Sequence, residues 1–132
     1  MVRTLKPSIA VLALTSLGWL ASAAAAQRNP AAAAVKNPVQ PTQESLAAGR
    51  QIYQRNCATC HGTSGAGGPG NDLIPAAPSL VGDQWEHGST DGEIFESIKN
   101  GVPPDFNMVP WKDRLKDEEI WNVVNYVRSL KK

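Results

Sequence analysis

The 132-residue chain has two cysteines, and both lie in the run Cys57-Ala58-Thr59-Cys60-His61, which ends in a histidine. The spacing C-x-x-C-H is the attachment site for a c-type haem. Two thiols separated by two residues can form thioethers with neighbouring vinyl groups on one edge of the porphyrin, and His61 can then bring its imidazole to the iron. The motif therefore predicts one covalent haem c, with Cys57 and Cys60 as its attachment points and His61 as an axial ligand.

Two other chemistries use cysteines at this spacing. A thioredoxin-like dithiol needs a strand–helix–strand context, and no segment alternates in the way a strand would. A structural zinc site needs about four ligands, and beyond this motif His87 is the only thiol or imidazole side chain left. Haem attachment is thus the favoured interpretation. No nucleophile–base pair or carboxylate dyad is evident elsewhere, so we expect no enzyme activity of the chain's own.

Two side chains could supply the second ligand to the iron. Met108 lies in a loop bracketed by prolines, and the only other methionine is Met1. Most methionines fill gaps in a core, but a thioether sulfur also ligates haem iron, as an imidazole does. We expect Met108 to be the second axial ligand. His87 is the alternative, although its surroundings favour a solvated turn.

The first 26 residues differ in composition from the rest. Arg3 and Lys6 give a basic start, residues 9–20 form a nearly unbroken apolar run, and residues 21–26 are mostly alanine. This order is typical of a secretory signal peptide. We expect cleavage before Gln27 and export to the periplasm. An uncleaved membrane anchor is the alternative, because the apolar stretch approaches the length of about 20 residues that spans a bilayer.

The remaining chain divides into a linker and one domain. Residues 27–41 combine prolines with an alanine run and hold little apolar bulk, which predicts a flexible linker; a short alanine helix broken by prolines is the alternative. Residues 42–132 form the domain, which is small enough for a built-in prosthetic group to help its core. The formal net charge of the whole chain is +1, which excludes binding to nucleic acid through bulk charge.

Hydrophobic spacing in the domain predicts three helices and no strands. Thr42 can cap a helix that runs to about residue 57. A capping box from Thr90 to Glu93 opens a second helix that stops at Gly101, and an apolar stripe predicts a third from about residue 117 to 130. Residues 62–82 and 102–111, rich in glycine and proline, are predicted to be loops. Short helices with such long loops need a large apolar group at the centre to order them.

The domain resembles a small bacterial class I c-type cytochrome over nearly all of residues 44–130. Gly49 and Tyr53 lie eight and four residues before Cys57, where that family crosses its first helix against its last, and Val123 and Tyr126 lie at the matching part of the last helix. A glycine at such a crossing lets two helix backbones approach closely. The resemblance implies a cytochrome c-like fold around one haem with histidine and methionine ligands.

Further matches concern the surroundings of the haem. Pro78-Ser79-Leu80 resembles the family's Pro-x-Leu. This implies that the Pro78 carbonyl accepts a hydrogen bond from the second nitrogen of His61 and that Leu80 packs on the porphyrin. The roles of three tryptophans stay open between hydrogen bonds to the haem propionates and core packing: Trp85, Trp111 and Trp121.

Two positions depart from the family pattern. Val109 separates Met108 from Pro110, where the family usually has methionine followed directly by proline, so the geometry of this loop is left open. Lys116 stands where the family commonly has a serine or threonine cap. Asp117 is then the nearest side chain that could cap the last helix.

These features favour a single-electron carrier that shuttles electrons between exported or membrane redox partners. Ligands on both faces of the iron leave no open position for a substrate, and a neutral thioether favours Fe(II). The alternatives are a tethered cytochrome subunit of a dehydrogenase or oxidase complex, and a five-coordinate haem that binds a gas or peroxide. We expect a monomer whose partners are a redox donor and acceptor, with no nucleic acid and with membrane contact only through an uncleaved leader.

Overall fold

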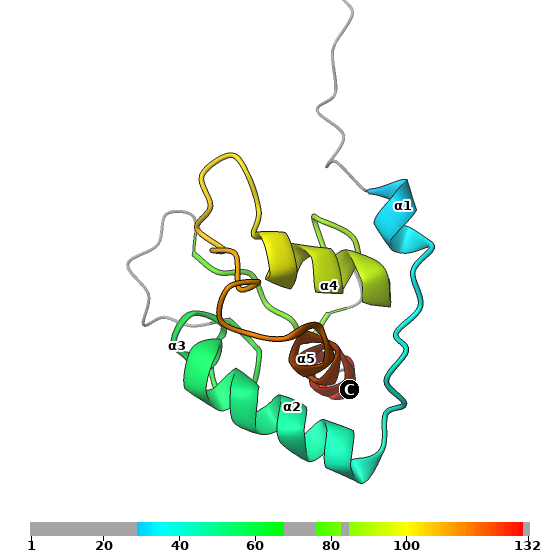
Figure 1. Ribbon diagram of the computed structural model, residues 1–132. Helices are drawn as coiled ribbons and strands as arrows, with labels where there is room; N and C mark the ends of the chain where they lie inside the picture. Colours follow the sequence, from blue (N-terminus) through cyan, green and yellow to red (C-terminus); the bar gives the residue numbers. More distant parts are fainter. Residues whose placement is uncertain (1–28, 68–75, 83–84, 131–132) are drawn as a thin grey trace, which may run out of the picture.

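The computed structural model describes residues 29–67, 76–82 and 85–130 (Figure 1). These residues form α1 (Pro30–Ala33), α2 (Gln43–Asn56), α3 (Ala58–His61), α4 (Asp91–Asn100) and α5 (Asp117–Ser129). No strand occurs among them, which agrees with the prediction of an all-α domain. The expected signal peptide, residues 1–26, lies outside the described residues. Within the described part, no helix has the length and apolar character needed to span a bilayer.

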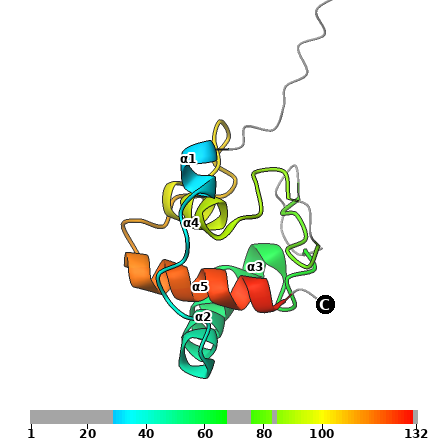
Figure 2. The same ribbon diagram turned by 90° about the vertical axis from the view of Figure 1, so that its right-hand side faces the viewer.

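The two longest helices cross and form the centre of the fold. α2 runs beneath α5, as the two views at right angles show (Figures 1 and 2). A Cβ atom at Gly49 of α2 would overlap the carbonyl oxygen of Asn122 and would lie 2.9 Å from Cβ of Tyr126. Beside this contact the rings of Tyr53 and Tyr126 lie 5.2 Å apart. The predicted crossing is therefore confirmed, and only a residue without a side chain allows the two backbones to touch.

α2 also begins where its sequence predicts. The side-chain oxygen of Thr42 accepts a hydrogen bond from the Ser45 N–H at 3.2 Å, which caps the helix. At the other end the Cys57 N–H donates to the Tyr53 carbonyl at 2.8 Å. The last turn of α2 thus leads directly into the C-x-x-C-H motif.

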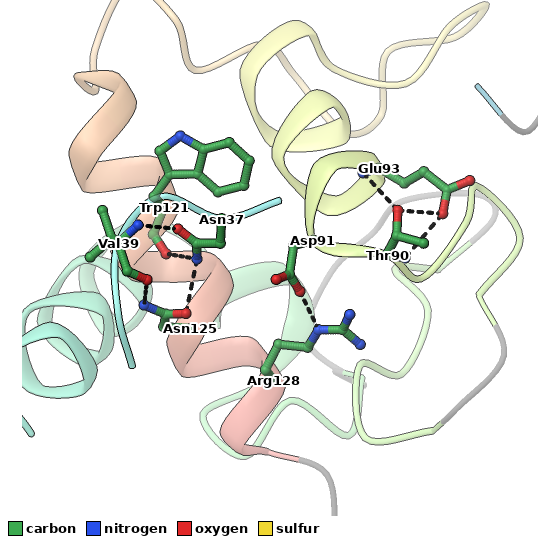
Figure 3. Close-up of polar contacts among 8 residues, drawn as sticks. All are labelled: Asn37, Val39, Thr90, Asp91, Glu93, Trp121, Asn125 and Arg128. Atoms are coloured by element: carbon green, nitrogen blue, oxygen red, sulfur yellow. Dashed lines mark hydrogen bonds and ion pairs between the residues drawn. The ribbon is translucent and has the colours of Figure 1, made fainter. Parts of the chain in front are cut away.

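α4 begins with the predicted capping box (Figure 3). The Thr90 hydroxyl accepts a hydrogen bond from the Glu93 N–H at 3.3 Å, and the Glu93 carboxylate accepts one from the Thr90 N–H at 3.0 Å. The helix stops at Gly101, whose φ is 73°. Its apolar side packs on α5, where the rings of Phe95 and Trp121 stack at 3.9 Å. The buried core consists of Tyr53, Ile94, Phe95, Ile98, Ile120, Trp121, Val123, Val124 and Val127.

The start of α5 corrects one expectation. The helix begins at Asp117 as predicted, but Asp117 is not its cap. The Glu119 carboxylate accepts a hydrogen bond from the Lys116 N–H at 2.8 Å, while Asp117 forms an ion pair with Lys99 of α4 at 2.9 Å. Glutamate can reach back to the residue before a helix because it lies one turn away on the same side. A second ion pair joins Arg128 near the end of α5 to the first residue of α4 at 2.7 Å (Figure 3).

Residues 29–41, the described part of the expected linker, lie against the domain. α1 sits at the start of α4 (Figure 2), and its Ala32 is buried. The Asn37 amide donates to the Trp121 carbonyl at 3.1 Å and to Asn125 Oδ1 at 2.9 Å, and Asn125 donates to the Val39 carbonyl at 3.0 Å (Figure 3). These bonds satisfy buried polar groups of α5. The described part of this segment therefore packs on the domain and contains a short alanine helix, α1.

Gly49→Ala should destabilise the domain by about 1–3 kcal/mol, because a methyl group there must push apart the backbones of α2 and α5. Thermal unfolding of the haem-loaded protein measures the effect. Ala47→Ser, at an exposed position of the same helix, is the control and should change the midpoint little. If the Gly49→Ala variant were as stable as the control, the close helix contact would be wrong.

Candidate functional site

A cavity of about 660 Å³ lies between the helices and the two long loops. α4 and α5 form one side of it through Ile94, Ile98, Val123 and Val127. The other sides come from the end of α2, from α3, from residues 76–80 and from residues 102–111. Most of the lining is apolar, so the cavity suits a large apolar group with few polar contacts.

α3 holds the predicted attachment motif at the wall of this cavity. The Cys57 carbonyl accepts hydrogen bonds from the N–H groups of Cys60 at 3.1 Å and of His61 at 2.9 Å. One helical turn therefore gathers the three side chains, which are half-buried and line the cavity together. The arrangement is set by local hydrogen bonds, which is why the sequence spacing alone could predict it.

The His61 ring is oriented by a contact with the predicted Pro-x-Leu segment. Its Nδ1 lies 3.2 Å from the Pro78 carbonyl oxygen. A carbonyl can only accept, so Nδ1 carries the proton and Nε2 keeps its lone pair. Burial lowers the pKa of His61, and the hydrogen bond to Pro78 opposes this shift. The imidazole thus favours the neutral form that a metal ligand requires.

Tyr53 contributes to the site in a way that the sequence analysis missed. Its hydroxyl donates to the Gly62 carbonyl at 2.8 Å, directly after His61. Burial raises the pKa of Tyr53 to about 12, so the hydroxyl stays protonated and keeps donating. The sequence feature that could have indicated this contact is the position of Tyr53 one helical turn before Cys57, on the same side of α2.

Backbone hydrogen bonds hold parts of the chain that follows the motif. The Gly67 N–H donates to the His61 carbonyl at 3.0 Å, and the Leu80 N–H donates to the Gly65 carbonyl at 2.6 Å. These two bonds bring residues 76–80 to the cavity wall, where Pro78 and Leu80 both line it. The structure therefore brings the predicted Pro-x-Leu segment to the attachment motif.

The chemistry of the thiols disfavours the other two interpretations of the motif. Burial, reinforced by the neighbouring Cys60, raises the pKa of Cys57 to about 11. A thiol with such a pKa is protonated at neutral pH, unlike the reactive thiolate of a dithiol redox centre. In the described ranges no three histidine, cysteine or acidic side chains gather as metal ligands would.

Met108 reaches the same cavity from the loop between α4 and α5. The Val102 N–H donates to the Met108 carbonyl at 3.0 Å, and the Trp111 N–H donates to the Ile98 carbonyl at 3.1 Å. These bonds close the loop at both ends even though Val109 separates Met108 from the following proline. Met108 is half-buried and lines the cavity, as the cysteines and His61 do.

The remaining candidates divide between the cavity and the core. His87 also borders the cavity but is exposed, as the sequence analysis expects for a solvated turn. Trp121 belongs to the core, stacked on Phe95, whereas Trp85 and Trp111 line the cavity. Nε1 of Trp85 is buried and has no hydrogen-bond acceptor in the part of the chain that the structure describes. Such a donor costs about 1–3 kcal/mol unless an acceptor is supplied.

Comparison with known proteins gives a consistent set of relatives. The cbb3-type cytochrome c oxidase subunit FixP of Sinorhizobium medicae (strain WSM419) is 34% identical over an alignment of 103 positions that covers 73% of this chain and 33% of the relative. The subunit CcoP of Rubrivivax gelatinosus is 34% identical over 102 residues, which are 76% of this chain and 29% of the relative. The chain therefore spans about a third of the length of these curated relatives.

A solved structure gives the same fold. Cytochrome cL from the marine methylotrophic bacterium Methylophaga aminisulfidivorans MPT superposes with a TM-score of 0.56 at 26% identity, over 67% of this chain and 55% of that chain. An all-α fold with C-x-x-C-H at the wall of an apolar cavity defines a c-type cytochrome, a protein that transfers electrons through haem c. The family described as cytochrome c oxidase, cbb3-type, subunit III matches residues 44–127, and the chain belongs to it.

Proposed function

We propose that this chain binds one haem c in the described cavity and works as a single-electron carrier. The observation that carries the proposal is the convergence of four side chains on one apolar cavity, three from the turn that joins α2 to α3 and from α3 itself, and one from the loop between α4 and α5. Cys57 and Cys60 would form the two thioethers, and His61 and Met108 would ligate the iron from opposite sides.

The donor set and the surroundings fit this group. The cavity is mostly apolar, as a porphyrin ring requires. His61 presents a neutral imidazole whose Nδ1 is occupied by the Pro78 carbonyl, which leaves Nε2 for the iron. Nε1 of Trp85 on the cavity wall has no acceptor among the described residues, and propionate carboxylates are acceptors of the kind that would satisfy it.

When bound, the haem supplies one-electron chemistry by cycling between Fe(II) and Fe(III). The protein's residues determine how that chemistry is used. His61 and Met108 would both hold the iron, which would leave it no open position for a substrate and suit it to electron transfer alone. Both ligands are neutral, and a thioether favours the less charged Fe(II), which raises the reduction potential. The apolar lining excludes water from the site, which also raises the reduction potential.

The relatives indicate where such a carrier would act. FixP and CcoP are named as subunits of a cbb3-type cytochrome c oxidase. We propose that this chain delivers or accepts electrons as a cytochrome module of the same kind, either as a mobile carrier or as a tethered subunit of an oxidase or dehydrogenase complex, without an enzyme activity of its own. The basic and apolar start of the chain supports export to the periplasm.

Replacing Cys57 and Cys60 together with alanine should abolish covalent attachment, because no other cysteine is present. The variant should also lose most of its helicity, since the core is too small without the ring. Haem-stained denaturing gels and circular dichroism measure both effects. Each single cysteine variant is the matched control and should retain haem through one thioether. A covalent haem signal in the double variant would contradict the assignment of the attachment residues.

Met108→Ala should keep the covalent haem and most of the helicity, because His61 and both thioethers remain. It should remove the sulfur-to-iron charge-transfer band of the oxidised protein, open the sixth position to carbon monoxide, and lower the reduction potential. His87→Ala is the control and should change none of these. If the wild type lacked the band and bound carbon monoxide freely, the iron would not be ligated by methionine. Opening of the site by His87→Ala alone would assign the ligand to His87.

The mature chain should begin at Gln27 if the leader is a cleaved signal peptide. Intact mass spectrometry of the exported, haem-loaded protein decides this directly. A variant with a large residue in place of Ala26 is the control, because it should block cleavage and retain residues 1–26. A wild-type mass that retains those residues would replace the mobile carrier with a membrane-tethered one.

A further inference from the structure

The turn that follows His61 is held by the hydroxyl group of Tyr53. This residue of α2 is fully buried, and its hydroxyl donates to the Gly62 carbonyl at 2.8 Å. The same carbonyl accepts a second hydrogen bond, from the Gly65 N–H at 3.2 Å. A Cβ atom at Gly65 would lie 3.6 Å from the Tyr53 hydroxyl oxygen. The hydroxyl therefore lies beside both ends of the turn formed by residues 62–65.

Further hydrogen bonds join this turn to the carbonyl that contacts the His61 ring. The Leu80 N–H donates to the Gly65 carbonyl at 2.6 Å. Two residues before Leu80, the Pro78 carbonyl oxygen lies 3.2 Å from Nδ1 of His61. A path of covalent and hydrogen bonds thus leads from His61 through the turn to Leu80, and returns through Pro78 to the His61 ring. We call this closed set of bonds the His61 network.

Tyr53 contributes a buried side chain to the His61 network. Its ring belongs to the hydrophobic core and lies 5.2 Å from the ring of Tyr126. By contrast, Pro78 and Ser79 are exposed, and Leu80 is only half-buried. An exposed segment depends on its hydrogen bonds to keep one position, because few packed side chains hold it. The Tyr53 hydroxyl therefore links the exposed Pro78 carbonyl to the core.

We infer that Tyr53 is a positioning residue for His61: its hydroxyl holds the turn after the histidine and so keeps the Pro78 carbonyl within reach of Nδ1. This inference rests on the proposed ligation of the haem iron by His61. A hydrogen bond at Nδ1 makes the imidazole a stronger electron donor through Nε2. A stronger donor favours Fe(III) over Fe(II), so the Tyr53 hydroxyl lowers the reduction potential by acting through His61.

Tyr53→Phe tests the inference, because it removes the hydroxyl and keeps the buried ring. In the reduced, haem-loaded protein the Nδ1 proton of His61 should exchange with solvent about tenfold faster or more, since its bond to Pro78 opens more often. The equilibrium with a reference redox couple should also move about twofold or more toward Fe(II). Proton NMR and potentiometric titration measure the two effects.

Tyr126→Phe is the matched control, because it removes the hydroxyl of the neighbouring tyrosine and leaves the His61 network intact. It should change neither the exchange rate nor the potential. If Tyr53→Phe raises the potential without faster exchange at Nδ1, the loss of a polar group acts directly and the inference is wrong. A variant that loses thermal stability but keeps both wild-type values would assign Tyr53 to the core alone, which also overturns it.

The wild-type protein decides the question if Tyr53→Phe fails to bind haem. The protection factors of the Tyr53 hydroxyl proton and of the His61 Nδ1 proton should agree within about threefold, because one opening of the network exposes both. The chain has two tyrosines, so Tyr126→Phe assigns the hydroxyl signal. Protection factors that differ more than about tenfold would overturn the inference and leave the carrier untouched. A wild type without covalent haem would instead contradict the proposed function.

Discussion

The contact of α2 with α5 at Gly49 is the constraint on which the rest of the structure depends. A side chain at this position would overlap the backbone of α5, so the two helices can cross this closely only where α2 has a glycine. Because α2 continues without interruption from Gly49 to the C-x-x-C-H motif, the crossing sets where α3 stands relative to α5. The same helix α5 lines the cavity through Val123 and Val127. One missing side chain thus places the attachment residues opposite the apolar surface on which a haem would lie.

Beside the buried core, the rest of the domain encloses the apolar cavity. Several backbone hydrogen bonds of the two long loops lie at the cavity wall: Gly67 to His61, Leu80 to Gly65, and Val102 to Met108. Long loops of this kind would gain order from a group that they enclose. Binding of the proposed haem would then be coupled to folding, as in other small domains whose cofactor completes the core.

Much of the fold could be predicted because its signals are local. The cap at Thr42, the capping box at Thr90 and the glycine stop at Gly101 each depend on a few neighbouring residues, and each occurs as predicted. The attachment motif is local in the same sense, since one helical turn brings its side chains together.

Features that depend on distant partners were not predictable in this way. Residues 29–41 pack on α5 through Asn37 and Asn125, which are 88 positions apart, and nothing in the alanine- and proline-rich sequence indicates that pairing. Glu119, rather than Asp117, accepts the hydrogen bond at the start of α5, and Asp117 instead pairs with Lys99 on another helix. The resemblance to class I cytochromes helped where pattern alone could not, since it identified the crossing at Gly49 and the carbonyl of Pro78 behind His61.

The central claim is that Met108 and His61 hold a haem iron between them, and the methionine methyl groups report on it most directly. The chain has only Met1 and Met108, so labelling methionine methyls with ¹³C gives at most two signals in the reduced, diamagnetic protein. A methyl bound through sulfur to the iron lies above the porphyrin, and the ring current should shift the Met108 signal strongly upfield, outside the normal methyl range. Met108→Leu should remove that signal. A wild-type spectrum in which every methionine methyl appears at its ordinary position would contradict the account.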